Sequence, residues 1–457
     1  MRADAIIIGA GQAGVPLAVR LARSGRKVLL VERALLGGTC INYGCTPTKT
    51  LVASARAAHV ARSASRLGVH ASAVRVDFPA IIARKDALVH QWRQGIAQRL
   101  AAAGDGLRVV SGHARFVGER QIEVDGDVHH SELIVVNVGA RPAAPPIDGI
   151  GSVAWLDNRR IMELPRLPTH LVVLGGGYIG CEFAQMFRRF GSDVTIVQHG
   201  PHLLDREDPE VSEELEKAFR AEGIELHLGA RAAQVSQEPG GRIVVALESG
   251  ATITASHLLA AVGRRPNTDD LGCEASRIQL NANGFIEVDD RYRTSAPGVH
   301  AVGDVTGGPQ FTHTSWDDHR ILFDILQGHS TRGRAGRVIP YSVFTDPQVA
   351  GVGLNERNAR TRGIQHEVAR MPFGQVARAI EIDETVGIIK VLVDPTTERI
   401  LGASLVGAEA GELVHVFATL MQAGASARAI VDAEFAHPTF AEGLQGAVMT
   451  LDRYALH

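Results

Sequence analysis

Two of the four cysteines in this chain of 457 residues, Cys40 and Cys45, have only four residues between them. Gly44 lets the backbone curl between them, so a disulfide is sterically accessible at this spacing. Pro47 and the alanine-rich stretch after it predict a helix that begins near Cys45. A helix N-terminus favours the thiolate, which is the reactive form of cysteine. A redox-active pair and a pair of buried structural thiols both fit this pattern.

A dinucleotide-binding motif about thirty residues upstream of Cys40 favours the redox interpretation. An apolar strand is predicted at 5–8, a helix at 15–24 and a second strand at 27–31. The glycines permit a tight turn, close approach to a pyrophosphate and packing of the helix on the strand, and the acid holds a ribose hydroxyl. The motif residues are Gly9, Gly11, Gly14 and Glu32.

A second motif of the same kind follows the apolar run 171–174, with a helix predicted from Cys181 to Phe190 and a strand at 193–197. Its glycines are Gly175, Gly177 and Gly180. Two such folds imply two dinucleotides and electron transfer between them. The strand at 193–197 is followed by Gln198 and His199 instead of an acid, which removes the main barrier to a 2′-phosphate and favours NADPH. His199, with Arg206 or His202, is expected to face that phosphate.

Composition excludes several other classes of protein. The formal charge of −3 and the pI near 6.7 give no electrostatic footprint for nucleic acid or an anionic membrane. No apolar run has transmembrane length and no cleavage site follows the N-terminus, so a soluble cytoplasmic protein is expected. The histidines lack metal-ligand spacing, so no metal site is predicted, and Cys181 and Cys273 are expected to be structural.

The run Gly37–Leu51, GGTCINYGCTPTKTL, resembles the redox signature of the class I pyridine nucleotide–disulfide oxidoreductases, which include dihydrolipoamide dehydrogenase, glutathione reductase and mercuric reductase. The resemblance extends over nearly the whole chain. It implies an α/β fold with two Rossmann-like dinucleotide-binding domains plus a C-terminal α+β dimerisation domain. The expected division is FAD-binding at 1–145 and 267–336, NAD(P)H-binding at 146–266, and dimerisation at 337–457.

The resemblance also implies roles for single residues. Tyr178 would cover the flavin until the nicotinamide enters, and Glu182 would pair with Lys49 beside the flavin; the alternatives are plain packing for Tyr178 and a solvated helix face for Glu182. Asp304 would accept a hydrogen bond from the ribityl chain of FAD. Further expected contacts with FAD come from Gly38, Thr39, Lys49, Gly139, Gly263 and Gly303.

Near the C-terminus, His437 and Glu442 match a His-Pro-Thr-x-x-Glu motif of the family. The resemblance implies that His437 is the acid–base group, that Glu442 orients it, and that it acts on the disulfide of the partner subunit in a homodimer. Electrons would pass from NAD(P)H through FAD to a Cys40–Cys45 disulfide. Cys45 would then contact the flavin, and Cys40 would be the exposed thiol that attacks the substrate.

The substrate is predicted only as a class: a small-molecule disulfide or dithiol, or a metal ion. A mercuric-reductase-like metal-ion reductase and a dihydrolipoamide dehydrogenase are the enzymatic alternatives. The presence of His437 and the lack of a cysteine pair in 452–457 disfavour mercury, and Gln198 disfavours dihydrolipoamide dehydrogenase. A catalytically idle flavoprotein with a binding role is the non-enzymatic alternative. A transhydrogenase or oxidase would not need both cysteines.

Overall fold

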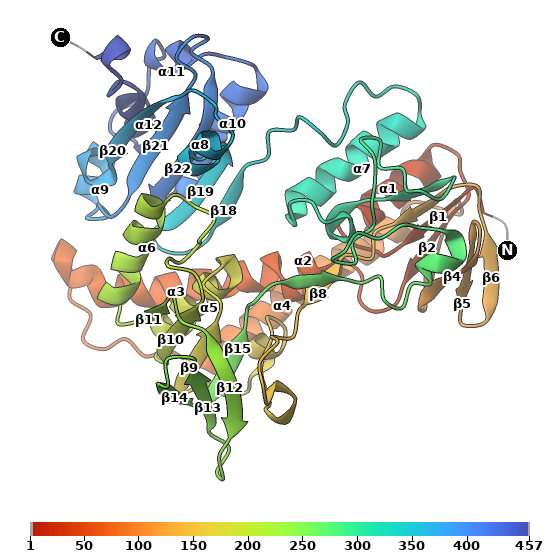
Figure 1. The fold of residues 1–457 in the computed structure, drawn as a ribbon, viewed down its shortest axis with the longest axis horizontal. Helices are drawn as coiled ribbons and strands as arrows, with labels where there is room; N and C mark the ends of the chain where they lie inside the picture. The colour runs from red at the N-terminus through yellow and green to blue at the C-terminus, as the bar shows by residue number, and fades with distance from the viewer. Residues whose placement is uncertain (1–2, 456–457) are drawn as a thin grey trace. The chain divides into compact units, whose positions relative to one another are not determined.

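The computed structural model describes residues 3–455, which form two compact units (Figure 1). Unit 1 contains the residues up to Thr50, Ile82–Ala143 and Gly263–Arg337; unit 2 contains Leu51–Ile81, Ala144–Val262 and the residues from Val338. Residues 51–81 belong to unit 2 although they precede 145, and unit 2 holds both 144–262 and the residues from Val338. The expected division into FAD-binding, NAD(P)H-binding and dimerisation domains stays a prediction.

Unit 1 is built on a parallel sheet of five strands in the order β17-β7-β1-β2-β3. Its strands are β1 (Ala5–Ile8), β2 (Val28–Glu32), β3 (Leu107–Ser111), β7 (Ile134–Val136) and β17 (Val299–Ala301). The central strand β1 is fully buried and uniformly apolar, as expected for a parallel sheet that is covered on both faces. This strand order places the C-terminal ends of β1 and β7 side by side. The glycine motif follows directly after β1.

The helices and smaller sheets of unit 1 surround this sheet. The helices are α1 (Gly14–Arg23), α2 (Gly38–Tyr43), the start of α3 (Cys45–Ser63), most of α4 (Phe78–Ala101) and α7 (Thr312–Leu326). The additional strands are β4 (Ala114–Gly118), β5 (Gln121–Val124) and β6 (Asp127–His130), which form an antiparallel sheet, and β8 (Ala140–Pro142) with β16 (Arg264–Pro266). The predicted helices at 15–24 and after Cys45 are thus confirmed within a residue or two.

Unit 2 contains a second parallel sheet, in the order β11-β10-β9-β15. Its elements are β9 (His170–Leu174), α5 (Tyr178–Phe190), β10 (Asp193–Gln198), α6 (Pro209–Ala221), β11 (Glu225–Leu228) and β15 (His257–Ala260). An antiparallel sheet is formed by β12 (Ala232–Gln237), β13 (Ile243–Leu247) and β14 (Thr252–Ala255). The order β9, α5, β10 is the second predicted β-α-β unit.

The C-terminal part of unit 2 changes to an antiparallel sheet, β18-β19-β22-β21-β20. Its strands are β18 (Tyr341–Val343), β19 (Gln348–Gly353), β20 (Glu367–Pro372), β21 (Ile388–Val393) and β22 (Ile400–Gly407). Its helices are α8 (Glu356–Thr361), α9 (Ala377–Glu381), α10 (Ala410–Gln422), α11 (Arg428–Val431) and α12 (Phe440–Val448). With the two parallel sheets, this confirms the predicted α/β fold class with two Rossmann-like units and a C-terminal α+β part.

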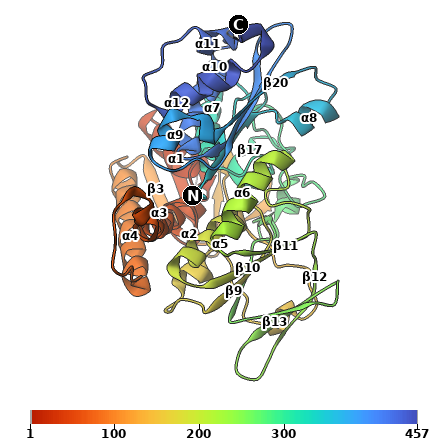
Figure 2. The same ribbon diagram turned by 90° about the vertical axis from the view of Figure 1, so that its left-hand side faces the viewer.

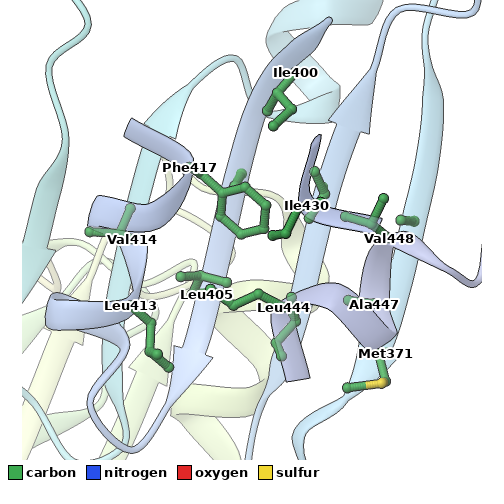
Figure 3. Packing of buried hydrophobic residues seen from close by; sticks show 14 of the residues in the cluster. Met371, Ile400, Leu405, Leu413, Val414, Phe417, Ile430, Leu444, Ala447 and Val448 are labelled. Atoms are coloured by element: carbon green, nitrogen blue, oxygen red, sulfur yellow. The ribbon is translucent and has the colours of Figure 1, made fainter. Parts of the chain in front are cut away.

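The core of this C-terminal part lies between the sheet and the helices α10, α11 and α12 (Figure 3). Leu405 of β22 and Phe417 of α10 are buried almost completely there, and Leu444 of α12 packs beside them. The burial of large apolar side chains on one face fixes α12, which follows directly after His437. The core thus determines where the His437 motif lies.

Helix α6 contacts both β11 and β22, so it links the parallel sheet of unit 2 to the C-terminal antiparallel sheet (Figure 2). Lys390 of β21 is 1% exposed, and its ammonium lies 2.7 Å from carboxylate oxygens of both Asp208 and Glu356. Asp208 also accepts hydrogen bonds from the backbone N–H groups of Glu356 and Arg357. This buried network fixes the segment before α6, which carries Asp205 and Glu207.

Within residues 3–455, no helix combines the length and the apolarity that a membrane span requires.

Candidate active site

A cavity of about 300 Å³ lies in unit 1 and collects most of the predicted flavin-binding residues. Predicted residues on its wall are Gly9, Gly11, Glu32, Gly38, Thr39, Cys40, Cys45, Gly139 and Asp304. They come from four separate parts of the sequence, and the parallel sheet brings the parts together. The cysteine pair and the dinucleotide motif therefore share one cavity.

The glycine loop has no room for side chains at two positions. A Cβ atom on Gly9, whose φ is +103°, would lie 2.3 Å from the carbonyl oxygen of Asn137. A Cβ on Gly14 would lie 2.0 Å from the carbonyl oxygen of Gly9. Asn137 closes the arrangement, because its side-chain oxygen accepts the N–H of Gly14 at 2.9 Å and its amide donates to the carbonyl of Val302. Asn137 was not predicted as a site residue. Its only signal in the sequence is a polar side chain within the apolar run 133–138.

Glu32 ends β2 beside this loop. Its two carboxylate oxygens accept hydrogen bonds from the N–H groups of Ala10 and Ala34, each at 2.8 Å. A carboxylate has about four acceptor positions, so lone pairs remain for a ribose hydroxyl on the cavity side. The residue lies where the β-α-β motif predicts the ribose-binding acid.

We expect Gly14→Ala to release FAD from the purified protein, because the added methyl group forces α1 away from β1 or distorts the loop. Overpacking of this kind costs about 1–3 kcal/mol or more. The ratio of the 280 nm and 450 nm absorbances measures the bound flavin. Gly95→Ala is the matched control, since a Cβ on Gly95 in α4 meets nothing within 4 Å and should leave the flavin content unchanged. Full flavin retention in Gly14→Ala would show that the loop does not hold FAD.

Cys40 lies within α2, and Cys45 is the first residue of α3. Helix α3 starts at Cys45, as predicted from Pro47 and the alanine-rich stretch. Both cysteines are present as thiols, and the thiol of Cys40 is hydrogen-bonded to Cys45. This hydrogen bond and burial raise the pKa of Cys40, while a hydrogen bond with Thr312 and the nearby Lys49 ammonium oppose the shift. The sulfur of Cys45 lies 3.0 Å from the hydroxyl oxygen of Thr312 at the start of α7.

The arrangement differs from the expectation that Cys40 is the exposed thiol. Cys45 is exposed and Cys40 is half-buried. Both sulfur atoms belong to residues of the cavity wall, so the exposure of Cys45 is consistent with a sulfur that faces the flavin site. Which sulfur contacts the flavin stays a prediction. Thr312 thus provides a hydroxyl partner for the cysteine pair.

The polar side chains of the cavity fit FAD as the ligand. Burial raises the pKa of the Asp304 carboxyl, and the Arg264 guanidinium at 3.6 Å opposes this shift. Within residues 3–455, the Nε atom of Arg264 is buried without a hydrogen-bond partner. Polar groups of this kind are satisfied when a polar ligand enters. The hydroxyl-rich ribityl chain and the pyrophosphate of FAD match this requirement.

The loop of the second motif repeats the geometry of the first. A Cβ on Gly180 would lie 2.0 Å from the carbonyl oxygen of Gly175, just as Gly14 meets Gly9. The side-chain oxygen of Gln198 accepts the N–H of Gly176 at 2.9 Å. Next to it, the carboxylate of Asp205 lies 3.4 Å from the Gln198 amide and 3.9 Å from His199. Asp205 belongs to no sequence motif and was not predicted as a site residue.

Tyr178 is the first residue of α5, directly after Gly177. Its ring stacks on that of Tyr341, with centroids 5.9 Å apart and planes at 9°. The hydroxyl of Tyr341 donates to Glu207 at 2.5 Å, and Tyr178 is hydrogen-bonded to the same carboxyl group. Gly351 makes room for this ring, since a Cβ there would lie 2.3 Å from the Tyr341 hydroxyl. Tyr178 therefore belongs to a packed, hydrogen-bonded cluster with Tyr341 and Glu207. No sequence pattern indicated this cluster.

Burial raises the pKa of Glu207 from 4.5 to about 6. The folded protein thus binds this proton more tightly than the unfolded chain, so the stabilisation by the neutral carboxyl is lost as the pH rises through about 6. Glu207→Gln keeps an acceptor for Tyr341 but cannot ionise. We expect its free energy of unfolding, relative to that of wild type, to be about 2 kcal/mol higher at about pH 7.5 than at about pH 4.5. Melting temperatures at both pH values measure this gain, and Glu213→Gln on the exposed face of α6 is the control. A pH-independent difference would contradict the assignment.

The predicted partners Lys49 and Glu182 lie in unit 1 and unit 2, so their pairing stays a prediction. Glu182 is 6% exposed, which excludes the alternative that it lies on a solvated helix face. One of its carboxylate oxygens accepts the N–H of Phe344 at 2.8 Å. Cys181 and Cys273 are buried, in agreement with a structural role.

His437 lies just before α12 with its side chain 72% exposed. Its Nδ1 atom lies 2.9 Å from a carboxylate oxygen of Glu442. Glu442 and Thr439 also form the capping box of α12, so the same carboxylate holds both the helix start and the imidazole. This fixes the ring and leaves Nε2 directed away from Glu442, as an acid–base group requires.

Comparison with known proteins extends these observations. A family model described as pyridine nucleotide-disulphide oxidoreductase matches residues 3–318, and the model of the dimerisation domain of that family matches residues 339–448. A probable pyridine nucleotide-disulfide oxidoreductase, RclA of Escherichia coli strain K12, is 38% identical over 96% of this chain and 97% of its own length. A dihydrolipoyl dehydrogenase of Thermus scotoductus is 35% identical over 99% and 98%.

A mercuric reductase of Lysinibacillus sphaericus is 34% identical over 98% of this chain and 83% of that protein. A solved structure described as a Cu(II) complex of the HOCl-induced flavoprotein disulfide reductase RclA of Escherichia coli superposes with a TM-score of 0.90 at 36% identity. That comparison covers 99% of this chain and all of the other.

Proposed function

The chain belongs to the pyridine nucleotide-disulphide oxidoreductases, and from that membership we propose which of its residues carry the electrons. It is an FAD-dependent disulfide oxidoreductase that uses a pyridine nucleotide. FAD, when bound, accepts a hydride from the nicotinamide and passes the electrons to a disulfide. The proposal rests on one observation: the hydrogen-bonded pair Cys40–Cys45 shares a cavity with the glycine loop, Glu32 and Asp304.

The two thiols have different tasks in this proposal. Cys45, at the N-terminus of α3, holds negative charge beside the flavin, supported by the helix dipole and by the hydroxyl of Thr312. Cys40 keeps its proton, because its hydrogen bond to Cys45 and its burial raise its pKa. Cys40 therefore needs a base before it can attack a substrate disulfide, and Lys49 favours the resulting thiolate.

The base is His437 of the partner subunit. The chain carries the dimerisation domain of the family, which supports a homodimer. The exposed imidazole, held by Glu442, is free on one side to exchange a proton with a neighbouring chain. It removes the proton of Cys40 and returns it to the leaving thiol of the substrate.

The second β-α-β unit binds the nicotinamide nucleotide, with Gly175, Gly177 and Gly180 at the pyrophosphate and Tyr178 at the entry to the flavin. The lack of an acid at Gln198 favours NADPH, whereas the carboxylate of Asp205 beside it favours NADH. These two features oppose each other.

A small-molecule disulfide is the first candidate for the electron acceptor, because a dithiol with a mobile proton exchanges directly with disulfides. Copper(II) is the second candidate. The observation that favours it is the Cu(II) complex described for a relative that covers 99% of this chain. Soft thiolate ligands suit Cu(I), the product of such a reduction.

Turnover assays with lipoamide, glutathione disulfide, Cu(II) and Hg(II) test the proposal, with Cys40→Ser as the blank. We expect at least one acceptor to be reduced by the wild type and not by the variant. Equal rates in both proteins for every acceptor would contradict a route through the cysteine pair.

A further inference from the structure

In the second nucleotide-binding unit, an uncharged side chain stands where the first unit has its ribose-binding acid. In the first unit, Glu32 accepts the N–H of Ala10, which stands 22 residues before it. In the second, Gln198 accepts the N–H of Gly176, which also stands 22 residues before it. Gln198 therefore occupies the position of Glu32. Its one oxygen is used by the backbone, and the rest of its amide is a donor without charge.

The loop after β10 places a carboxylate, that of Asp205, beside Gln198. The Oδ2 atom of Asp205 lies 3.4 Å from Nε2 of Gln198 and 3.9 Å from Nε2 of His199. Gly200 makes this approach possible, because a Cβ there would lie 2.9 Å from both the Asp205 carboxylate and the Gln198 amide. The Asp205 side chain is 40% exposed, so its carboxylate is accessible to a ligand.

The loop that carries Asp205 is fixed to the nucleotide-binding turn itself. The N–H of Leu204 donates to the carbonyl of Gly176 at 2.8 Å, and Leu204 adopts a φ of +48° to reach it. A Cβ on Gly176 would lie 2.6 Å from the side chain of Leu203, so the loop packs closely against the turn. The carboxylate is therefore held at the strand end.

We propose that Asp205 replaces the missing strand-end acid: it accepts a hydrogen bond from the adenosine ribose 2′-hydroxyl of NADH and repels the 2′-phosphate of NADPH. The chain then prefers NADH, contrary to the expectation from Gln198 alone. A permanent cation beside this loop is Arg357, whose guanidinium donates to the backbone carbonyl of Asp205 at 2.7 Å. His199 lies beside the same carboxylate, and His202 lies 3.2 Å from Glu216. The inference rests on the proposal that the β9–α5–β10 unit binds the nicotinamide nucleotide.

The test measures kcat/KM of the holoenzyme for NADH and for NADPH with one fixed acceptor. We expect wild type to prefer NADH, and Asp205→Asn to lower the NADH-to-NADPH ratio about tenfold or more, mainly through KM, since a charged hydrogen bond and a repulsion are both removed. Asp193→Asn is the control, because this exposed acid lies at the opposite end of β10. Its ratio should equal that of wild type.

A rescue separates recognition from damage to the fold. Gln198→Glu in the Asp205→Asn background should restore most of the NADH preference, because it returns an acid to the same place by another route. An unchanged ratio in Asp205→Asn, or a wild type that prefers NADPH, would overturn the inference. Failure of both nucleotides to reduce the flavin of the wild type would instead contradict the proposed function.

Discussion

Cys40→Ser is expected to lower turnover of a disulfide acceptor by about 10³-fold or more, while the nicotinamide nucleotide still reduces the flavin at close to the wild-type rate. A serine hydroxyl neither forms the disulfide nor ionises near neutral pH. The glycine loops and Tyr178 are untouched, so the nucleotide half of the reaction is preserved. Stopped-flow reduction of the flavin and steady-state turnover measure the two halves separately.

The matched control is Cys273→Ser, which changes a buried cysteine of unit 1 that packs in an apolar cluster and does not itself line the cavity. It should keep wild-type turnover, although it can lower the melting temperature. Cys40→Ser with a tenth or more of wild-type turnover would contradict the role of Cys40. Loss of flavin reduction in that variant would show that Cys40 acts in the other half of the reaction.

His437→Ala is expected to lower disulfide turnover by about 10²- to 10⁴-fold, the usual range for loss of a general acid–base group, without slowing reduction of the flavin. The reason is the raised pKa of Cys40, which leaves that thiol protonated unless a base acts on it. His227→Ala removes a different His–Glu pair of unit 2, in which the imidazole lies 2.9 Å from Glu225, and should have no such effect.

A mixed dimer tests whether the imidazole acts on the other subunit. Cys40→Ser and His437→Ala subunits, each inactive alone, should recover about a quarter of wild-type activity when they are unfolded together and reassembled at random, because half of the dimers then contain one intact site. No recovery, in dimers shown by tag exchange to have formed, would contradict a shared site.

The motifs that the sequence revealed are those whose requirements are local. Gly9 and Gly14 follow a strand at fixed distances, and Cys45 precedes Pro47, so their backbone geometry is determined by neighbours in the chain. The pairing of Glu442 with His437, five residues before it, was implied by the resemblance to the family, and the capping box around Glu442 adds a local constraint.

The features that the sequence did not reveal depend on long-range packing. Thr312 meets Cys45 across 267 positions, and Tyr341 meets Glu207 across 134. No period or spacing encodes such contacts, because they depend on how sheets and helices pack. Asp205 is only seven positions from Gln198, yet the irregular loop between them, with Leu204 at positive φ, hides the contact.

Anaerobic titration of the FAD-loaded protein with NADH tests the coupling of Cys45 to the flavin most directly. After two electrons per subunit, we expect a long-wavelength absorbance band from charge transfer between a Cys45 thiolate and the oxidised flavin, with the 450 nm band largely retained. The band should be absent from Cys45→Ser. Simple bleaching of the wild-type flavin, with no long-wavelength band, would mean that the cysteine pair is not coupled to FAD and would contradict the proposed route of the electrons.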